Sequence, residues 1–144
     1  MGAHRAEHSE VIAGTPGACF EAVTDFGSYP EWQSAVKDCH VLEHSAETVV
    51  VEFEVDAKVR RVRYVLRYHL EPPRRLWWEY LEGDLRSIDG DYEFEDLGDG
   101  TTRATYRVGL DPGRFVPGPV RRLLTGQVMR VSVAELRDRV ETAS

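Results

Sequence analysis

The sequence lacks the features that mark several large protein classes. It contains two cysteines, too few for the disulfide framework of a small secreted protein. No apolar run approaches the ~20 residues that a membrane-spanning helix needs, and the N-terminus lacks the apolar core of a signal peptide. Acidic residues outnumber basic ones by 25 to 18, and the net charge of −7 argues against a general nucleic-acid-binding protein. We therefore expect a cytoplasmic protein without an integral membrane segment or a nucleic-acid partner.

The motifs of the common enzyme classes are also missing. The chain has no nucleophile elbow, no pair of metal ligands, no glycine-rich phosphate loop and no dinucleotide fingerprint. Its serines are isolated, and Cys19 is better explained as a small core residue than as a nucleophile. The residues alone therefore predict no catalytic group, no metal site and no cofactor.

What the chain does have is the composition of an ordinary globular domain. Of its 144 residues, 42% are hydrophobic and 30% are charged. A chain of this length can bury about 68% of the surface that it exposes when unfolded. We expect one domain that spans residues 1–144.

The longest helical pattern lies in the last third of the chain, from about residue 119 to residue 140. Prolines and glycines interrupt the segment before it, and Pro119 suits a first helical turn. The apolar residues of this helix form two stripes: Val120, Leu123, Leu124, Val128, Val131 and Ala134 on one face, and Met129, Val133, Leu136 and Val140 on roughly the opposite face. Because a surface helix needs only one apolar stripe, we expect the rest of the chain to grip this helix from both sides.

The N-terminal part combines a strand, a short helix and an aromatic turn. Residues 1–14 favour a strand. Thr15 as the N-cap and Pro16 at the first helical position predict a helix that continues to about Thr24. The next segment, residues 25–32, is dense in aromatic side chains. This segment is either a plug at one end of the core or one wall of a pocket.

Residues 36–110 follow a period of two, which predicts a long antiparallel meander. One face of each predicted strand is apolar or aromatic, and the other face is charged, as in a sheet that packs on a core with one side only.

The register of one hairpin can be argued from the same pattern. A three-residue loop at residues 83–85 sets Trp78 opposite Gly90, where the missing side chain leaves room for the indole. The same register sets Glu82 opposite Arg86, and Tyr80 opposite Ile88.

A set of short motifs distributed along the chain resembles the START-like superfamily of polyketide cyclases and lipid-transport proteins (SRPBCC), and within it the coenzyme Q-binding relatives. The motifs are Thr15-Pro16, Phe20, Asp25, Tyr29-Pro30-Glu31-Trp32, Gly90 before Tyr92-Glu93-Phe94, Asp99-Gly100-Thr101 and Pro117. The resemblance implies an α+β helix-grip fold, in which a curved antiparallel sheet of about seven strands wraps around a long C-terminal helix. These motifs are largely structural, so they specify the fold more than the function.

The resemblance also implies a cavity between the sheet and the helix. Tyrosines and tryptophans on the predicted inner face suit a mostly apolar pocket with a few orienting polar groups, although an aromatic-rich solid core would show the same pattern. The predicted ligand-binding residues are Trp32, Phe53, Tyr64, Tyr68, Trp78, Tyr80, Arg86, Tyr92, Tyr106, Phe115, Leu124 and Val128.

Two features of this pocket can be specified further. Arg86 is either a polar anchor for a ligand carbonyl or carboxylate, or the partner of Glu82 in an ion pair at the hairpin end. We expect the pocket to open between residues 115–119 and residues 25–32.

Three functions remain open on the sequence. The favoured one is a carrier or sensor of a lipophilic small molecule, such as a lipid, a quinone or a polyketide. The alternatives are a polyketide cyclase or dehydratase, and a protein-interaction module of the same fold. The oligomeric state is undetermined, with a dimer as one option.

Overall fold

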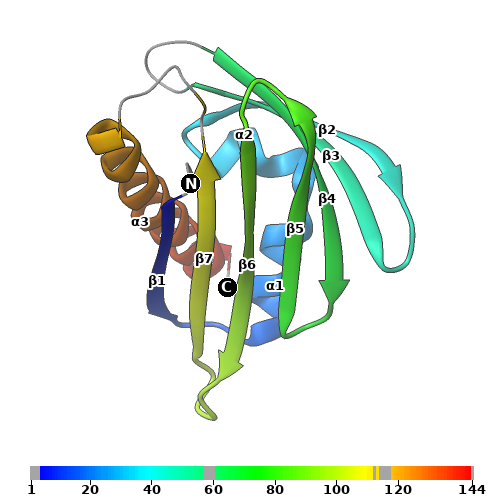
Figure 1. The fold of residues 1–144 in the computed structure, drawn as a ribbon. Coiled ribbons are helices and arrows are strands. Elements are labelled where there is room, and N and C mark those ends of the chain that lie inside the picture. The colour runs from blue at the N-terminus through cyan, green and yellow to red at the C-terminus, as the bar shows by residue number, and fades with distance from the viewer. Residues whose placement is uncertain (1–3, 57–60, 112, 114–117, 144) are drawn as a thin grey trace.

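The computed structural model describes residues 4–56, 61–111, 113 and 118–143, and within them the side chains of all residues except 4–5 and 118–129. The chain forms seven strands, two α-helices before and between them, one 3-10 helix and a long last helix (Figure 1). In chain order these are β1 (His4–Ile12), α1 (Pro16–Thr24), η1 (Phe26–Ser28), α2 (Tyr29–Trp32), β2 (Val36–His44), β3 (Thr48–Asp56), β4 (Arg61–Glu71), β5 (Arg75–Gly83), β6 (Ser87–Asp96), β7 (Thr102–Asp111) and α3 (Gly118–Ala143).

The strands form one antiparallel sheet in the order β1-β7-β6-β5-β4-β3-β2. Strands β2 to β7 are therefore a simple meander, and β1 completes the sheet by pairing with β7. The sheet is curved, and its concave side holds α3, which packs against β1 and β7 (Figure 1). The predicted helix-grip architecture is confirmed. None of the described helices has the length and apolar character needed to cross a membrane.

Local sequence signals explain the first helix. Thr15 adopts an extended backbone and its hydroxyl accepts a hydrogen bond from the Ala18 amide at 3.1 Å, as expected of an N-cap. Pro16 begins the helix, where its missing amide proton costs nothing. Cys19, Phe20 and Val23 are buried on one face, as predicted.

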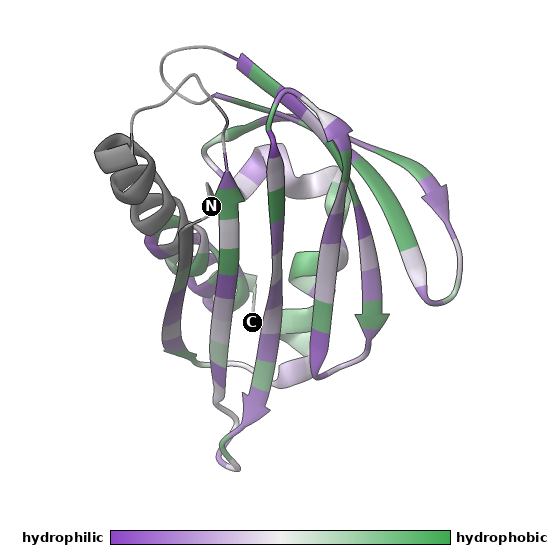
Figure 2. Cartoon of the chain, viewed as in Figure 1, coloured by the Kyte–Doolittle hydropathy of each residue, from purple (hydrophilic) through white to green (hydrophobic). Residues whose placement is uncertain are grey.

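The strands show the predicted division between two faces, visible as alternating colours along the central strands in Figure 2. The outer face carries rows of ion pairs such as Arg63 with Glu52 and Arg107 with Glu93, both with donor–acceptor distances of 2.5 Å. Exposed pairs of this kind contribute little to stability. We infer that the outer face is an ordinary solvent-exposed surface.

The last helix is longer than predicted at its C-terminal end, and only one of its two stripes is buried over the described side chains. Val133 and Leu136 are fully buried and Val140 nearly so, whereas Val131 is 40% exposed. The expectation that both sides are gripped is wrong at Val131. The helix lies on the sheet with one face, and hydrophobic spacing alone does not tell which of two stripes meets it. Val120, Leu123, Leu124, Val128 and Met129 lie outside the described side chains.

The predicted register between β5 and β6 is confirmed where the two strands pair. Trp78 lies opposite Gly90, and Leu76 lies opposite Tyr92. A Cβ atom added at Gly90 would lie 2.7 Å from Cζ2 of Trp78 and would also overlap the carbonyl oxygen of Arg107. Glycine is therefore required at this position.

The same ladder ends at Trp78 and Gly90, so the predicted pairs of Tyr80 with Ile88 and of Glu82 with Arg86 do not form. Beyond this point β5 continues alongside β4, while β6 continues alongside β7. Glu82 contacts Arg63 of β4 at 3.4 Å, and Arg86 contacts Asp111 of β7 at 3.8 Å. Past Trp78 and Gly90, β5 stays paired with β4 and β6 stays paired with β7. The alternation of residue types along a strand does not specify which neighbour it keeps.

The packing of α3 generates the first prediction. Leu136→Ala removes a fully buried side chain and should lower the free energy of unfolding by about 2–5 kcal/mol. Val131→Ala, on the exposed stripe of the same helix, should change it by less than about 0.5 kcal/mol. Urea denaturation of the two variants checks this, and equal midpoints would contradict the placement of the helix.

The contact between Trp78 and Gly90 leads to the second prediction. Gly90→Ala places a methyl group against the backbone of β7 and the indole of Trp78, so it should destabilise the protein by about 1–3 kcal/mol. Gly27→Ala is the matched control, because nothing lies within 4 Å of the added methyl there. Thermal melts should separate the two variants, and a Gly90→Ala protein that melts with the parent would refute the close approach.

Candidate functional site

The concave face carries one continuous cluster of aromatic rings contributed by β3 to β7. Tyr68 touches Trp78 with ring centroids 5.4 Å apart, and Trp78 touches Tyr106 at 5.7 Å. Tyr92 stacks on Tyr106 at 4.5 Å with an interplanar angle of 10°. Phe53 joins the cluster through Tyr64 and Tyr68. Six of the predicted ligand-binding residues are thus brought together.

The short helices η1 and α2 close one end of this cluster. Phe26 packs on Tyr68 at 4.6 Å, and Tyr29 packs on Phe53 at 5.7 Å. Trp32 reaches the cluster only through Tyr29, at 5.1 Å. Phe26 and Tyr29 were not among the predicted site residues, although they belong to the aromatic segment that the sequence marks as a plug or a pocket wall.

Some polar atoms of these aromatic side chains have protein partners. The Tyr29 hydroxyl donates to the carbonyl oxygen of Val23 at 2.6 Å, where it caps the last turn of α1. The Tyr80 hydroxyl donates to the carbonyl oxygen of Leu85 at 2.7 Å, and the Trp32 indole donates to the Ser28 hydroxyl at 3.2 Å. These side chains are fixed by the protein itself.

Other polar atoms at the centre of the cluster have no hydrogen-bond partner among the described residues. The side chains of Tyr68, Tyr92 and Tyr106 are buried and that of Tyr64 is half-buried, and no hydrogen bond joins their hydroxyls to the described part of the chain. The hydroxyl oxygens are nevertheless not among the fully enclosed atoms that lack a partner. The Trp78 indole nitrogen is fully buried and also lacks a partner there. Buried polar groups are paired in the great majority of cases, and each one left unpaired costs about 1–3 kcal/mol.

Burial keeps the phenols and thiols of this region protonated. Desolvation raises the pKa of Tyr68 and Tyr92 well above the usual value for tyrosine, and it raises the pKa of Tyr64 and Tyr106 in the same direction. It also raises the pKa of Cys39 to about 12. These groups are therefore neutral at physiological pH, and the phenols can donate hydrogen bonds without carrying charge.

Cys19 in α1 follows the same rule. Burial raises the pKa of its thiol to about 11, which suppresses the thiolate that a nucleophile would need. The Cys19 side chain is fully buried in the core on the inner face of α1, as expected from the sequence.

Polar residues after α2 tie this end of the cluster to α3. Gln33 is buried and donates from Nε2 to the carbonyl oxygen of Ser132 at 3.2 Å. The Ser34 amide donates to the Glu135 carboxylate at 3.1 Å. These contacts cannot be predicted from the sequence, because a single Gln and a single Glu follow no periodic pattern. These contacts place the residues after α2 beside α3, and the pocket entrance expected at residues 25–32 stays a prediction.

The remaining predicted site residues lie at the margin or outside the described part. Tyr80 is half-buried at the edge of the cluster. Arg86, the expected anchor, has a side chain that is 60% exposed and contacts Asp111 instead of Glu82. Phe115 lies outside the described residues. Leu124 and Val128 belong to α3, but their side chains are not described.

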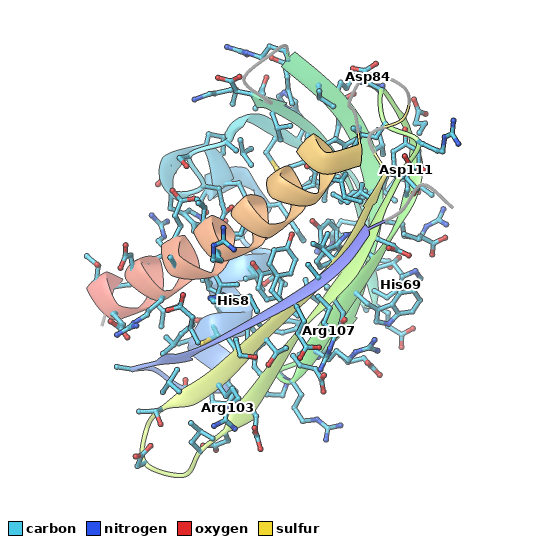
Figure 3. The ribbon with its side chains drawn as sticks, turned by 60° about the vertical axis from the view of Figure 1, so that its left-hand side comes forward. His8, His69, Asp84, Arg103, Arg107 and Asp111 are labelled. Atoms are coloured by element: carbon cyan, nitrogen blue, oxygen red, sulfur yellow. The ribbon has the colours of Figure 1, made fainter. Side chains whose placement is uncertain are left out.

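A histidine occupies the inner face at the edge strand β1. His8 lies opposite Tyr106 in the β1–β7 ladder, so both side chains share the concave side of the sheet. Its Nε2 atom lies 3.1 Å from the Glu10 carboxylate. Figure 3 shows His8 on the side of α3, whereas His69 and Arg107 lie on the opposite, convex side. Among the described residues no group of side chains could hold a metal ion.

The chain can now be compared with known proteins. A family model described as polyketide cyclase / dehydrase and lipid transport matches residues 3–141. Among curated proteins, none matches this sequence.

Solved structures share the fold over nearly the whole chain. A START superfamily protein from Mycobacterium smegmatis is 18% identical with a TM-score of 0.88, covering 98% of this chain and 99% of its own. The Zhui aromatase/cyclase from Streptomyces sp. R1128 is 20% identical with a TM-score of 0.83, covering 96% and 94%. A STAR-related lipid transfer protein from Xanthomonas axonopodis is 12% identical with a TM-score of 0.84, covering 95% and 85%.

Identities this low establish a common fold and leave ligand and activity to be argued from the site. The family model is the stronger finding, because it matches all but a few terminal residues. This chain belongs to the polyketide cyclase / dehydrase and lipid transport family.

Proposed function

We propose that this protein binds a lipophilic small molecule that carries oxygen atoms, between the concave face of the sheet and α3, as a carrier or sensor. One observation carries the proposal: polar groups without a hydrogen-bond partner in the described part of the chain gather on this face, namely the fully buried indole nitrogen of Trp78 and, around it, the hydroxyls of Tyr64, Tyr68, Tyr92 and Tyr106. An apolar pocket with a few convergent polar groups is the usual form of a small-molecule site. The unpaired hydroxyls are groups that a ligand oxygen would satisfy.

The lining that we propose is the aromatic cluster together with residues at its open side. It comprises Phe53, Tyr64, Tyr68, Trp78, Tyr80, Tyr92 and Tyr106, with Trp32, Phe115, Leu124 and Val128 at the entrance and on α3. The proposed lining leaves out Arg86, whose exposed guanidinium group is turned toward Asp111.

The state of the titratable groups supports binding over proton transfer by these residues. A general acid or base works best with a pKa near the working pH. The phenols of Tyr64, Tyr68, Tyr92 and Tyr106 and the thiol of Cys39 have a pKa raised by burial. They suit hydrogen bonding to a neutral ligand.

The third prediction tests the proposal through stability and affinity together. Tyr106→Phe removes a hydroxyl without a described partner, so it should leave the free energy of unfolding unchanged or raise it by up to about 1 kcal/mol. It should also weaken binding of 9-fluorenone, a flat aromatic ketone, by about fivefold, roughly 1 kcal/mol. Urea denaturation and quenching of tryptophan fluorescence measure the two effects.

Two controls accompany this variant. Tyr29→Phe makes the same chemical change but leaves the Val23 carbonyl without its donor, so it should lower the free energy of unfolding by about 1–3 kcal/mol. Trp77→Phe changes a ring that stacks on His69 on the outer face, so the affinity should stay within twofold. If the native protein binds no flat apolar probe, and native mass spectrometry of freshly purified protein finds no retained molecule, the face is a filled core and the proposal fails.

A polyketide cyclase or dehydratase is the second candidate, and one observation favours it. His8 is a titratable side chain on the concave face, and Glu10 is placed to orient it. A histidine held by a carboxylate beside neutral donors can take a proton from a carbon next to a carbonyl while the donors stabilise the resulting enolate.

The fourth prediction separates this candidate from simple binding. If the protein is a cyclase, wild type incubated with an aryl poly-β-ketone should release product lighter by one water per ring closed, as read by mass spectrometry. His8→Gln should slow this release at least a hundredfold, while fluorenone affinity stays within threefold. Equal product formation with both proteins would exclude His8 as the proton-transfer group.

A further inference from the structure

Strands β5 and β6 separate halfway along their length and form a fork in the sheet. Their ladder ends at the Trp78–Gly90 pair, although β5 runs on to Gly83 and β6 begins at Ser87. One arm is held to β4, where Gly83 lies opposite Tyr64. The other arm is held to β7, where the Arg86 amide donates to the Asp111 carbonyl oxygen at 2.9 Å. The backbone edges that face each other across the fork do not pair.

A single side chain spans this fork. Tyr80 stands on the β5 arm, and its hydroxyl donates to the carbonyl oxygen of Leu85, just before the β6 arm begins. Tyr80, Leu85 and Ile88 pack against the aromatic core from this side. The Tyr80–Leu85 hydrogen bond therefore joins the two arms where the ladder does not. A half-buried side-chain contact is easier to break than a run of backbone pairs.

The unpartnered indole of the aromatic cluster lies at the base of the same fork. Trp78 is 4% exposed, and its nitrogen has neither solvent nor a partner among the described residues. The ring lies across Gly90, with Cζ2 2.7 Å from the position of a Cβ atom there. Cζ2 and Nε1 are bonded to the same ring carbon, so the partnerless nitrogen belongs to the part of the ring that meets Gly90, where the ladder stops.

We propose, on the basis of the binding function above, that the β5–β6 fork is a gated subsite for an uncharged oxygen acceptor of the ligand, with Trp78 as its donor and Tyr80 as its latch. A ketone, ether or hydroxyl oxygen suits this position, because the surrounding rings offer no countercharge for a desolvated ion. In the closed form the indole N–H is unsatisfied. Release of Leu85 by Tyr80 lets an acceptor reach it, so the ligand binds the open form better than the closed one and shifts the equilibrium.

The test uses two probes of the same shape, 9-fluorenone with a carbonyl group and fluorene without one. In wild-type protein labelled with ¹⁵N-tryptophan, fluorenone should shift the Trp78 indole resonance downfield, and fluorene should not. The Trp32 indole, already bonded to Ser28, serves as the internal reference. The resonance missing from Trp78→Phe identifies the signal, and this measurement on wild type stands even if that variant folds poorly.

Variants then separate the donor from the latch. Trp78→Phe should weaken fluorenone at least tenfold, equivalent to about 1.4 kcal/mol, and leave fluorene within twofold. Tyr80→Phe keeps the ring and removes the latch, so stopped-flow association of fluorenone should become at least fivefold faster, whereas that of fluorene should stay within twofold. Trp77→Phe changes a neighbouring ring of β5 that stacks on His69 on the outer face and should leave the association rate within twofold.

The outcomes distinguish this inference from the function on which it rests. Binding of neither probe to wild type overturns both. If both probes bind but the Trp78 resonance does not respond to the carbonyl, or Trp78→Phe weakens both probes equally, the fork is not the acceptor subsite and the binding function stands. If Tyr80→Phe leaves the association rate unchanged, Tyr80 is not the latch.

Discussion

The contact on which the rest of the fold depends is the packing of the last turns of α3 against the edge formed by β1 and β7. Val133, Leu136 and Val140 are buried there. Gly14 allows the close approach, because a Cβ atom at this position would lie 2.6 Å from Val140. The Ala13 amide donates to Glu141 at 2.9 Å, and so joins the chain after β1 to the helix end. This anchorage fixes how the helix crosses the concave face, and the space between the two is the proposed site.

The concave face carries a polar atom that costs stability. The Trp78 indole nitrogen is fully buried without a partner among the described residues, and a phenylalanine at this position would avoid its desolvation. Proteins commonly depart from the most stable choice at functional sites. The contrast within one cluster is informative: Tyr29 and Tyr80 have carbonyl partners, whereas Tyr92 and Tyr106 stack face to face with hydroxyls that find none in the described chain.

Features that depend on a few neighbouring residues could be predicted from the sequence. Features that depend on how two elements pack against each other could not. The Thr15 cap, the alternating faces and the pairing of Trp78 with Gly90 follow from rules that act over a few residues. The burial of one α3 stripe and the exposure of Val131 depend on how the helix meets the sheet. Likewise, Arg86 turns to Asp111 because β6 follows β7, and no pattern within β6 reveals that choice.

The Trp78–Gly90 pair shows how one local feature serves both fold and site. Glycine is needed at this position because the indole lies across the strand. The same indole lies where the β5–β6 ladder ends, so it is both the last packed residue of the closed sheet and the first at the fork. Its N–H is buried and has no partner among the described residues. Family membership alone does not identify a ligand, because the solved structures that share this fold include an aromatase/cyclase and a lipid transfer protein, and their sequence identity to this chain is low. In this chain the partnerless indole nitrogen of Trp78 lies where the β5–β6 ladder ends, and for this reason the ligand that we propose carries an uncharged oxygen.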